Sequence, residues 1–149
     1  MILLPRRRVV LVAGAAAFAG IRPAGATPQE VAGLIAELAG GVALQHGRIK
    51  LELPELVENG NAVAMTVSVP KKIAGPERLA SIHVFAEGNP LPKVAAFYFG
   101  PRAGAPKVST RIRLATSQTV IAVAKYDDGS CWSDSVDLQV TLAACIEGV

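Results

Sequence analysis

Cysteine and histidine are scarce in this sequence. Its two cysteines and two histidines are spread through 149 residues without close pairing. Zinc sites usually draw their ligands from closely spaced Cys and His pairs, so we expect no metal and no other cofactor. The G-x-S-x-G elbow, the phosphate-binding glycine loop and the His-Glu-x-x-His motif are also missing. These absences argue against the standard classes of enzyme.

Acidic residues are missing from the first 26 residues, which hold four of the 15 Lys and Arg residues. The segment opens with Arg6, Arg7 and Arg8, continues through an uncharged apolar stretch, and closes with the small-x-small sequence Ala24-Gly25-Ala26. The apolar stretch is shorter than the ~20 residues that cross a bilayer as a helix, which makes a retained membrane anchor the weaker alternative. We predict that residues 1–26 are a cleaved signal peptide and that the mature protein starts at Thr27.

The paired arginines resemble a twin-arginine signal, which carries folded proteins across the bacterial inner membrane. Val9-Val10-Leu11 stands where that motif usually has Phe-Leu-Lys, so export itself is predicted more firmly than its route. Cleavage would leave 11 basic against 12 acidic residues, a formal charge of −1. We therefore expect a periplasmic protein with no stable membrane anchor and no nucleic-acid partner.

The residues after the signal suffice for one domain, and we assign residues 27–142 to it. Thr27-Pro28-Gln29-Glu30 has the features of a helix start, and Gly40-Gly41 those of a helix end. Apolar residues between them recur at helical spacing, at Val31, Leu34, Ile35 and Leu38. The domain therefore begins with one short helix.

Apolar residues alternate with polar ones along much of the remaining chain, as in strands with one buried face. The expected strands are 48–53, 63–69, 79–86, 94–99, 107–114, 120–126 and 135–142. Turn residues separate them, and Gly100 to Ala105 is expected to form an exposed loop. About seven short strands after one helix predict an all-β, immunoglobulin-like antiparallel sandwich.

Four charged or titratable residues outside the two cysteines are candidates for a site. His46, expected in a turn, and His83, expected in a strand among apolar neighbours, are assigned structural roles. Arg111 and Arg113 share a predicted strand face with Lys107. They are candidates to bind an anion or a partner's carboxylates, while an ordinary solvated face is the other interpretation.

The two cysteines have different surroundings in the sequence. Cys131 follows the Asp127-Asp128-Gly129 turn, and Cys145 follows the last predicted strand. About ten extended residues would separate them by roughly 30 Å, too far for a disulfide, whose Cα atoms lie within about 7 Å. A bridge would need the chain to fold back, so we expect Cys131 to pack at the edge of the core.

We expect the segment 143–149 to be a mobile arm, because it holds small residues beyond the last strand. A thiol on such an arm is suited to reaching into other proteins and holding a group covalently while partners act on it. Cys145 is therefore the main candidate for a working residue.

Several stretches resemble the SoxY family, the periplasmic sulfur carriers of bacterial thiosulfate oxidation. They are Glu58-Asn59-Gly60, Asn89-Pro90-Leu91-Pro92-Lys93-Val94-Ala95-Ala96-Phe97, Thr110-Arg111-Ile112-Arg113-Leu114-Ala115, Gln118-Thr119-Val120-Ile121-Ala122-Val123-Ala124 and Asp128-Gly129, in this order and before Cys145. The resemblance implies an immunoglobulin-like sandwich, a twin-arginine signal and a heterodimer with a second sandwich protein, SoxZ. It also implies that Cys145 carries sulfur intermediates, which separate periplasmic enzymes oxidise or hydrolyse.

The arm departs from the family's Gly-Gly-Cys-Gly-Gly pattern and reads Ala143-Ala144-Cys145-Ile146-Glu147. It resembles a SoxY-related branch with an Ala-Ala-Cys-Ile-Glu arm. Glycines give an arm conformational freedom and a narrow profile, whereas Ile146 adds bulk and Glu147 a negative charge. Because Glu147 disfavours a thiolate and repels an anionic sulfur group, the cargo need not be thiosulfate.

Three functions follow from these patterns. The first is a covalent carrier that uses Cys145 and is not itself an enzyme. The second is a periplasmic binding or assembly module that uses the sandwich surface. The third is a thiol oxidoreductase, for which we find no base, metal site or second nearby thiol.

Overall fold

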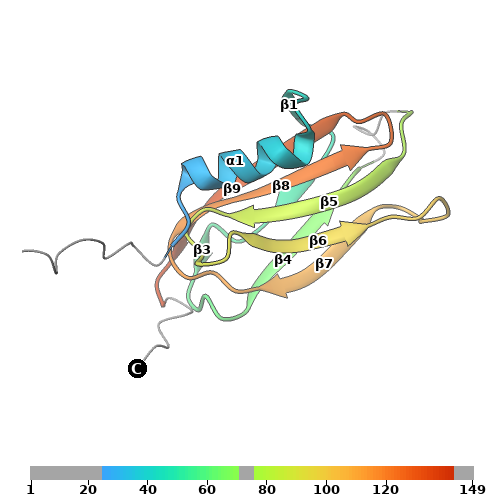
Figure 1. The fold of residues 1–149 in the computed structure, drawn as a ribbon. Coiled ribbons are helices and arrows are strands. Elements are labelled where there is room, and N and C mark those ends of the chain that lie inside the picture. Colours follow the sequence, from blue (N-terminus) through green and yellow to red (C-terminus); the bar gives the residue numbers. More distant parts are fainter. Residues whose placement is uncertain (1–24, 71–75, 143–149) are drawn as a thin grey trace, which may run out of the picture.

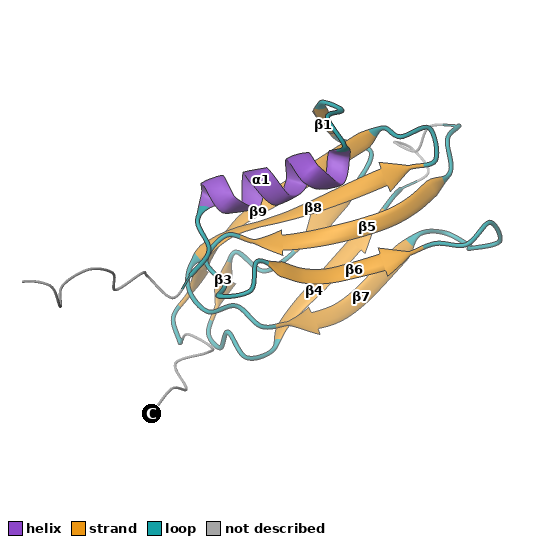
Figure 2. Cartoon of the chain, in the orientation of Figure 1, coloured by secondary structure: helices purple, strands orange, loops and turns teal. Residues whose placement is uncertain are grey.

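The computed structural model describes residues 25–70 and 76–142. In chain order the elements are α1 (Pro28–Ala39), β1 (Leu44–His46), β2 (Lys50–Glu52), β3 (Leu56–Val57), β4 (Val63–Ser68), β5 (Leu79–Ala86), β6 (Lys93–Tyr98), β7 (Lys107–Ile112), β8 (Gln118–Tyr126) and β9 (Cys131–Val140). The predicted all-β sandwich with one N-terminal helix is confirmed (Figure 2).

The strands form two sheets that face one another. The larger sheet has the order β1-β9-β8-β5-β6, with β3 also paired to β9, and the smaller has the order β2-β4-β7. The pairs β5–β6, β5–β8, β8–β9, β2–β4 and β4–β7 are antiparallel. The short strands β1 and β3 instead pair in parallel with the two ends of β9.

The domain has three layers, with α1 over the larger sheet and the smaller sheet behind it (Figure 1). The main core fills the space between the sheets and includes Met65, Ile82 and Leu114. A second core lies between α1 and the larger sheet and includes Val31, Phe85 and Cys131. These two cores explain why the strand 120–126 is apolar on both faces: β8 is covered by the helix on one side and by the smaller sheet on the other.

The signals read from the sequence account for both ends of α1. The Thr27 hydroxyl accepts a 3.2 Å hydrogen bond from the Glu30 amide, as an N-cap does. Gly40 ends the helix at φ +63°, a left-handed conformation that favours glycine, and its amide donates to Ala36 and Glu37. The buried residues Val31, Ile35 and Ala39 form the face that packs on the sheet.

The observed strands differ from the predicted ones around β9. His46 was predicted in a turn, but it ends β1, where it pairs with Ser133. β9 begins at Cys131 rather than near Ser135, and β7 ends at Ile112, so Arg113 lies just past its strand. Because β1 and β3 are short and held by a strand distant in sequence, no local alternation marked them.

None of the helices in the described residues has both the length and the apolar character needed to cross a membrane.

Candidate functional site

The candidate site was predicted on the arm, and its residues Ala143, Ala144, Cys145, Ile146 and Glu147 lie outside the described residues. The described chain reaches Leu142, three residues before Cys145. The point from which the arm starts is therefore defined, and the surrounding end of the sandwich can be described residue by residue.

The end of β3 and the loop that follows it hold the last residues before the arm. The Thr141 amide donates a 2.9 Å hydrogen bond to the Val57 carbonyl, and the Gly60 amide donates one of 2.9 Å to the Leu142 carbonyl. The Thr141 hydroxyl lies 3.2 Å from the Glu58 carbonyl and donates to it. We call Val57–Gly60 the arm socket, because it fixes the chain immediately before the arm.

The socket is tied to the smaller sheet and to the β7–β8 loop. The Leu114 amide donates a 2.9 Å hydrogen bond to the Gly60 carbonyl. On the opposite edge of the strand, the Val140 amide donates a 2.9 Å bond to the Ser117 hydroxyl. The chain from Val140 to Leu142 is therefore held from both sides.

Asn89, in the β5–β6 turn, joins a third loop to this end of the domain. Its side chain donates to the Arg113 carbonyl at 2.9 Å and accepts from the Ala115 amide at 2.8 Å and from the Gln118 amide group at 3.0 Å. The residue is buried.

Neighbouring Gly88 has no room for a side chain, because a Cβ there would lie 2.7 Å from the Thr116 methyl group. Asn89 and its partners Arg113, Ala115 and Gln118 all belong to stretches that carry the family resemblance. Those stretches therefore hold together the loops at this end of the domain.

Arg111 and Arg113 lie at this same end of the domain. Arg113 precedes Leu114, which is bonded to the arm socket, and both arginines are exposed. They line a groove of about 520 Å³ at the open edge between β6 and β7, together with Leu91 and Phe97. Lys107 begins β7, so the strand carries it away from this end. Arg113 therefore adjoins the residue that is bonded to the arm socket, and Arg111 lies two residues before it on the same strand side of the groove.

Cys131 is a buried residue of the second core and not a candidate nucleophile. Among the described residues it is a free cysteine, with no exposed surface. Burial raises the pKa of its thiol, and the positive charge of Lys125 offsets part of that effect. A buried thiol of raised pKa is unreactive near neutral pH.

The extended β9 separates Cys131 from the arm. The strand has 10 residues, and nine steps of ~3.3 Å give about 30 Å between the Cα atoms of Cys131 and Val140. The five residues from Val140 to Cys145 reach at most about 18 Å. A disulfide within one chain, which needs Cα atoms within about 7 Å, is therefore excluded.

Each histidine has a ring nitrogen near a serine hydroxyl. His83 Nε2 lies 3.0 Å from the Ser81 hydroxyl, and its ring packs edge-on against Tyr98 with centroids 5.7 Å apart. His46 Nδ1 lies 3.4 Å from the Ser133 hydroxyl. Within the described ranges, no group of three or more His, Cys, Asp or Glu residues is placed to hold a metal ion.

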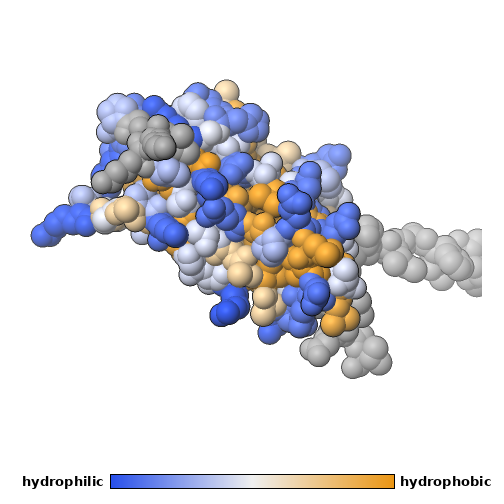
Figure 3. Space-filling model, turned by 180° about the vertical axis from the view of Figure 1, so that it is seen from behind, coloured by the Kyte–Doolittle hydropathy of each residue, from blue (hydrophilic) through white to orange (hydrophobic). Residues whose placement is uncertain are grey.

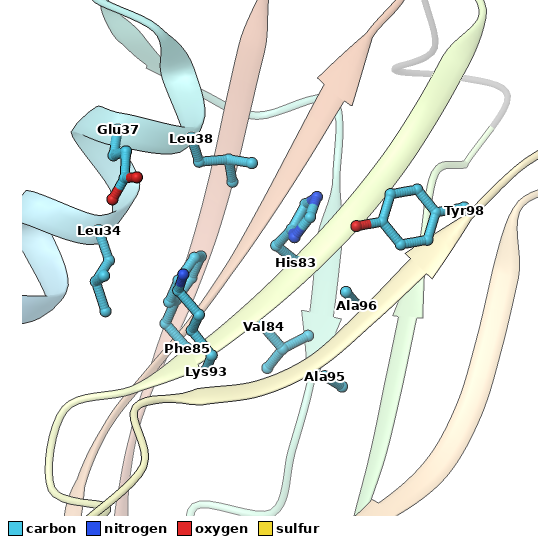
Figure 4. A pocket seen from close by; sticks show the side chains of 10 residues that line it. All are labelled: Leu34, Glu37, Leu38, His83, Val84, Phe85, Lys93, Ala95, Ala96 and Tyr98. Carbon is cyan, nitrogen blue, oxygen red and sulfur yellow. The ribbon is translucent and has the colours of Figure 1, made fainter.

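A second groove, which sequence reasoning missed, lies between α1 and the β5–β6 edge of the larger sheet. It has a volume of about 560 Å³. Figure 4 shows Leu34 and Leu38 of the helix on one side and His83 and Tyr98 on the other. The helix reaches over β9, β8 and β5 but leaves β6 uncovered, and Tyr98 is 77 % exposed. An aromatic residue at a strand end is the one feature of the sequence that points to this groove.

Comparison with known proteins identifies the family. The family model described as "Sulfur oxidation protein SoxY" matches residues 35–145, a span that ends on Cys145. No curated protein sequence matches the chain. Among solved structures, the sulfur carrier protein SoxY from Chlorobium limicola f thiosulfatophilum is similar, with a TM-score of 0.64 and 28% identity. That match covers 76% of this chain and 98% of the Chlorobium chain.

Two superoxide reductases share the fold. A putative one from Thermotoga maritima has a TM-score of 0.56 and 24% identity, over 66% of this chain and 93% of that chain. A neelaredoxin from Ignicoccus hospitalis has a TM-score of 0.52 and 22% identity, over 62% of this chain and 78% of that chain. At these identities the likeness concerns the sandwich alone.

Proposed function

This chain belongs to the SoxY family of sulfur oxidation proteins, and from that premise we propose that it carries a sulfur-containing intermediate on the thiol of Cys145. Partner enzymes act on the intermediate while it stays attached. The chain itself binds and presents the group and performs no turnover of its own.

The observation that carries this proposal is the family match, which extends to Cys145. Two features of the described residues support it. The chain is held at Thr141 and Leu142 by the arm socket, so an arm that starts there has a fixed origin. The other thiol, Cys131, is buried in the helix-covered core, which leaves Cys145 as the candidate for chemistry.

The attachment is an S–S bond between Cys145 Sγ and the sulfur atom of the cargo. Its formation from a thiol and a sulfur anion releases a proton and two electrons. We assign those electrons to a periplasmic redox enzyme that loads the carrier. A second, hydrolytic enzyme can then cleave a bond within the cargo and leave the S–S bond to Cys145 in place.

The sequence of the arm bears on which group it carries. We propose that Ala143-Ala144-Cys145-Ile146-Glu147 defines a branch whose cargo differs from that of arms rich in glycine. Glu147 adds a negative charge two residues from the thiol and opposes an anionic cargo. Arg111 and Arg113 line the groove at the β6–β7 edge and would offset that charge by binding the cargo's anionic group.

The remaining parts of the proposal concern location and partners. Residues 1–26 would act as a twin-arginine-type signal peptide, which places the mature protein in the periplasm. A SoxZ-like β-sandwich protein would form a heterodimer with the chain, and periplasmic sulfur-handling enzymes would load and unload Cys145. Residues 27–142 form the carrier domain in this scheme, and residues 143–149 form its arm.

The direct test is intact-mass spectrometry of protein isolated from its native periplasm. We expect mass adducts that a reductant removes, and we expect Cys145→Ser to abolish them. Cys131→Ala is the matched control, because it removes the other thiol and should leave the adducts in place. A wild-type protein that carries only free thiol under all growth conditions would contradict the proposal.

A second candidate function is a binding or assembly module that uses the sandwich surface. The groove beneath α1 favours it, because the exposed Tyr98 borders apolar side chains there. In this case Tyr98→Ser should weaken partner binding by ~10-fold or more, and Cys145→Ser should leave both binding and growth phenotype unchanged. The opposite pattern would favour the carrier.

A further inference from the structure

Exposed apolar side chains gather at the end of the sandwich where the arm begins. The large exposed hydrophobic residues of the described ranges are Val42, Leu56, Leu91, Tyr98 and Leu142. Three of them, Leu56, Leu91 and Leu142, are 60 %, 80 % and 61 % exposed and belong to β3, the β5–β6 turn and the chain after β9. Figure 1 places these three segments at one end of the domain.

The hydrogen bonds around the arm socket fix this arrangement. Leu142 is bonded to Gly60, Gly60 is bonded to Leu114, and the Arg113 carbonyl is bonded to the Asn89 side chain, two residues before Leu91. Viewed from behind, apolar surface reaches the right-hand side of the domain, which is the left-hand side in Figure 1 (Figure 3). We call Leu56, Leu91 and Leu142 the end leucines.

The number of residues between Leu142 and Cys145 limits where the thiol can act. Three residues span at most about 11 Å, and the cysteine side chain adds about 3 Å. Because the socket holds Leu142, the sulfur atom stays within about 14 Å of this end of the sandwich. An enzyme that acts on the attached group must bring its reaction centre within that distance, and its rim must then cover the domain end.

We propose that the end leucines form the docking surface for the enzyme that removes or changes the group on Cys145. This inference rests on the proposed carrier function and adds the surface through which the partner recognises the domain. The partner's chemistry is set by the surface: the rim around its substrate entrance carries exposed apolar side chains. The exposed side chains at this end also include charges of both signs, Glu58 with Arg111 and Arg113, so we assign the recognition mainly to the leucines.

Solvent exposure of the end leucines supports this assignment. Large side chains that stay exposed in a folded domain commonly mark an interaction surface when they occur together. Polar residues at these three positions would carry no cost to either core, since neither core includes the end leucines. Their occurrence on three separate segments around one exit point is explained by contact with a partner that receives the arm.

The test measures how fast the attached group is removed from Cys145 by the native periplasmic fraction. The carrier is isolated with its adduct, mixed with the fraction, and followed by intact mass. We expect the double variant Leu91→Ser, Leu142→Ser to lower the second-order rate constant by 10-fold or more. Val42→Ser is the matched control, because Val42 is exposed in the loop before β1, at the other end of β9, and it should change the rate by less than 2-fold.

Two further measurements separate docking from other causes. Alkylation of Cys145 by iodoacetamide should proceed at the wild-type rate in every variant, because a small reagent needs no docking surface. If the double variant is unfolded by circular dichroism, Leu91→Ser alone replaces it, since an 80 % exposed turn residue contributes little to folding. Removal at the wild-type rate from folded leucine variants would overturn this inference and leave the carrier function intact. Absence of any adduct on the wild-type protein would overturn the carrier function itself.

Discussion

The amide of Gly60 donates a 2.9 Å hydrogen bond to the carbonyl oxygen of Leu142, three residues before Cys145. This bond joins the β3–β4 loop to the point where the arm leaves the sandwich. It gives a structural reason for the Glu58-Asn59-Gly60 stretch, which carries part of the resemblance to SoxY proteins. The Asn59 side chain supports the loop by accepting a 2.9 Å hydrogen bond from the Asn61 amide.

The socket predicts an effect of Thr141→Val. This change keeps the shape of the side chain but removes the hydroxyl that lies 3.2 Å from the Glu58 carbonyl. We expect a loss of about 0.5–1 kcal/mol in the free energy of unfolding. Amide hydrogen exchange at Gly60 and Thr141 should become faster than in the wild type.

The matched control is Thr119→Val, which removes the 2.7 Å hydrogen bond from Thr119 to Asp137 in the β8–β9 pair. It should cost a similar free energy but leave exchange at Gly60 and Thr141 unchanged. If both variants speed exchange at the socket equally, the Thr141 hydroxyl has no special part in holding the arm base.

The two thiols should differ strongly in reactivity. Cys131 is fully buried, and burial raises its pKa, so native protein should react at one cysteine and denatured protein at two. Cys145→Ser should abolish labelling by iodoacetamide under native conditions, while Cys131→Ala should leave it unchanged. Mass spectrometry after brief labelling checks this. Two labels on native wild-type protein would mean that Cys131 is more accessible than the helix-covered core allows.

Elements with a local pattern were predicted well from the sequence. The period of two in Val63–Ser68 and the capping residue Thr27 before α1 depend on neighbours in the chain, and both appear as expected. The short strands β1 and β3 depend on β9, which follows them by some 80 residues, so no local signal was available. The same reason explains why His46 was placed in a turn.

For the candidate site, the sequence named residues but not their positions relative to one another. The sequence singled out Cys145 and the pair Arg111 and Arg113, yet it had no means of showing that Arg113 adjoins a residue bonded to the arm socket. That proximity arises from the hydrogen bond between Leu114 and Gly60, which joins two loops far apart in the sequence. The groove under α1 was missed because it depends on the helix leaving β6 uncovered.

Asn89 is expected to be a main source of stability at the arm end. Asn89→Ala would leave the Arg113 carbonyl, the Ala115 amide and the Gln118 side chain without their partner. We expect a loss of about 2–3 kcal/mol in the free energy of unfolding by urea, because the groups are partly buried. Asn61→Ala is the control: its side-chain hydrogen bond to Asn59 is exposed, and its removal should cost less than about 0.5 kcal/mol. Equal losses in the two variants would show that the Asn89 network does not stabilise this end.

His83 should make the domain less stable as the pH falls. Burial lowers the pKa of its imidazole below the ordinary value of 6.5, and the positive charges of Lys125 and Lys93 lower it further. Above pH 6.5 the ring is neutral in both the folded and the unfolded chain, so the pH has no effect through this residue. Below that value the unfolded chain takes up the proton more readily, and the folded state loses stability until the pH passes the folded pKa.

The experiment compares thermal unfolding between pH 7.5 and 5 in wild type, His83→Gln and His46→Gln. We expect the melting temperature to fall toward acid in the wild type and in His46→Gln. The fall should be smaller in His83→Gln, because glutamine does not titrate.

Nuclear magnetic resonance titration of the His83 ring should give a midpoint below 6.5, and a midpoint above that value would reverse the sign of the expected effect. Because the ring packs edge-on against Tyr98 in the groove under α1, a ligand or partner bound there should lower the midpoint further by removing more water from the ring.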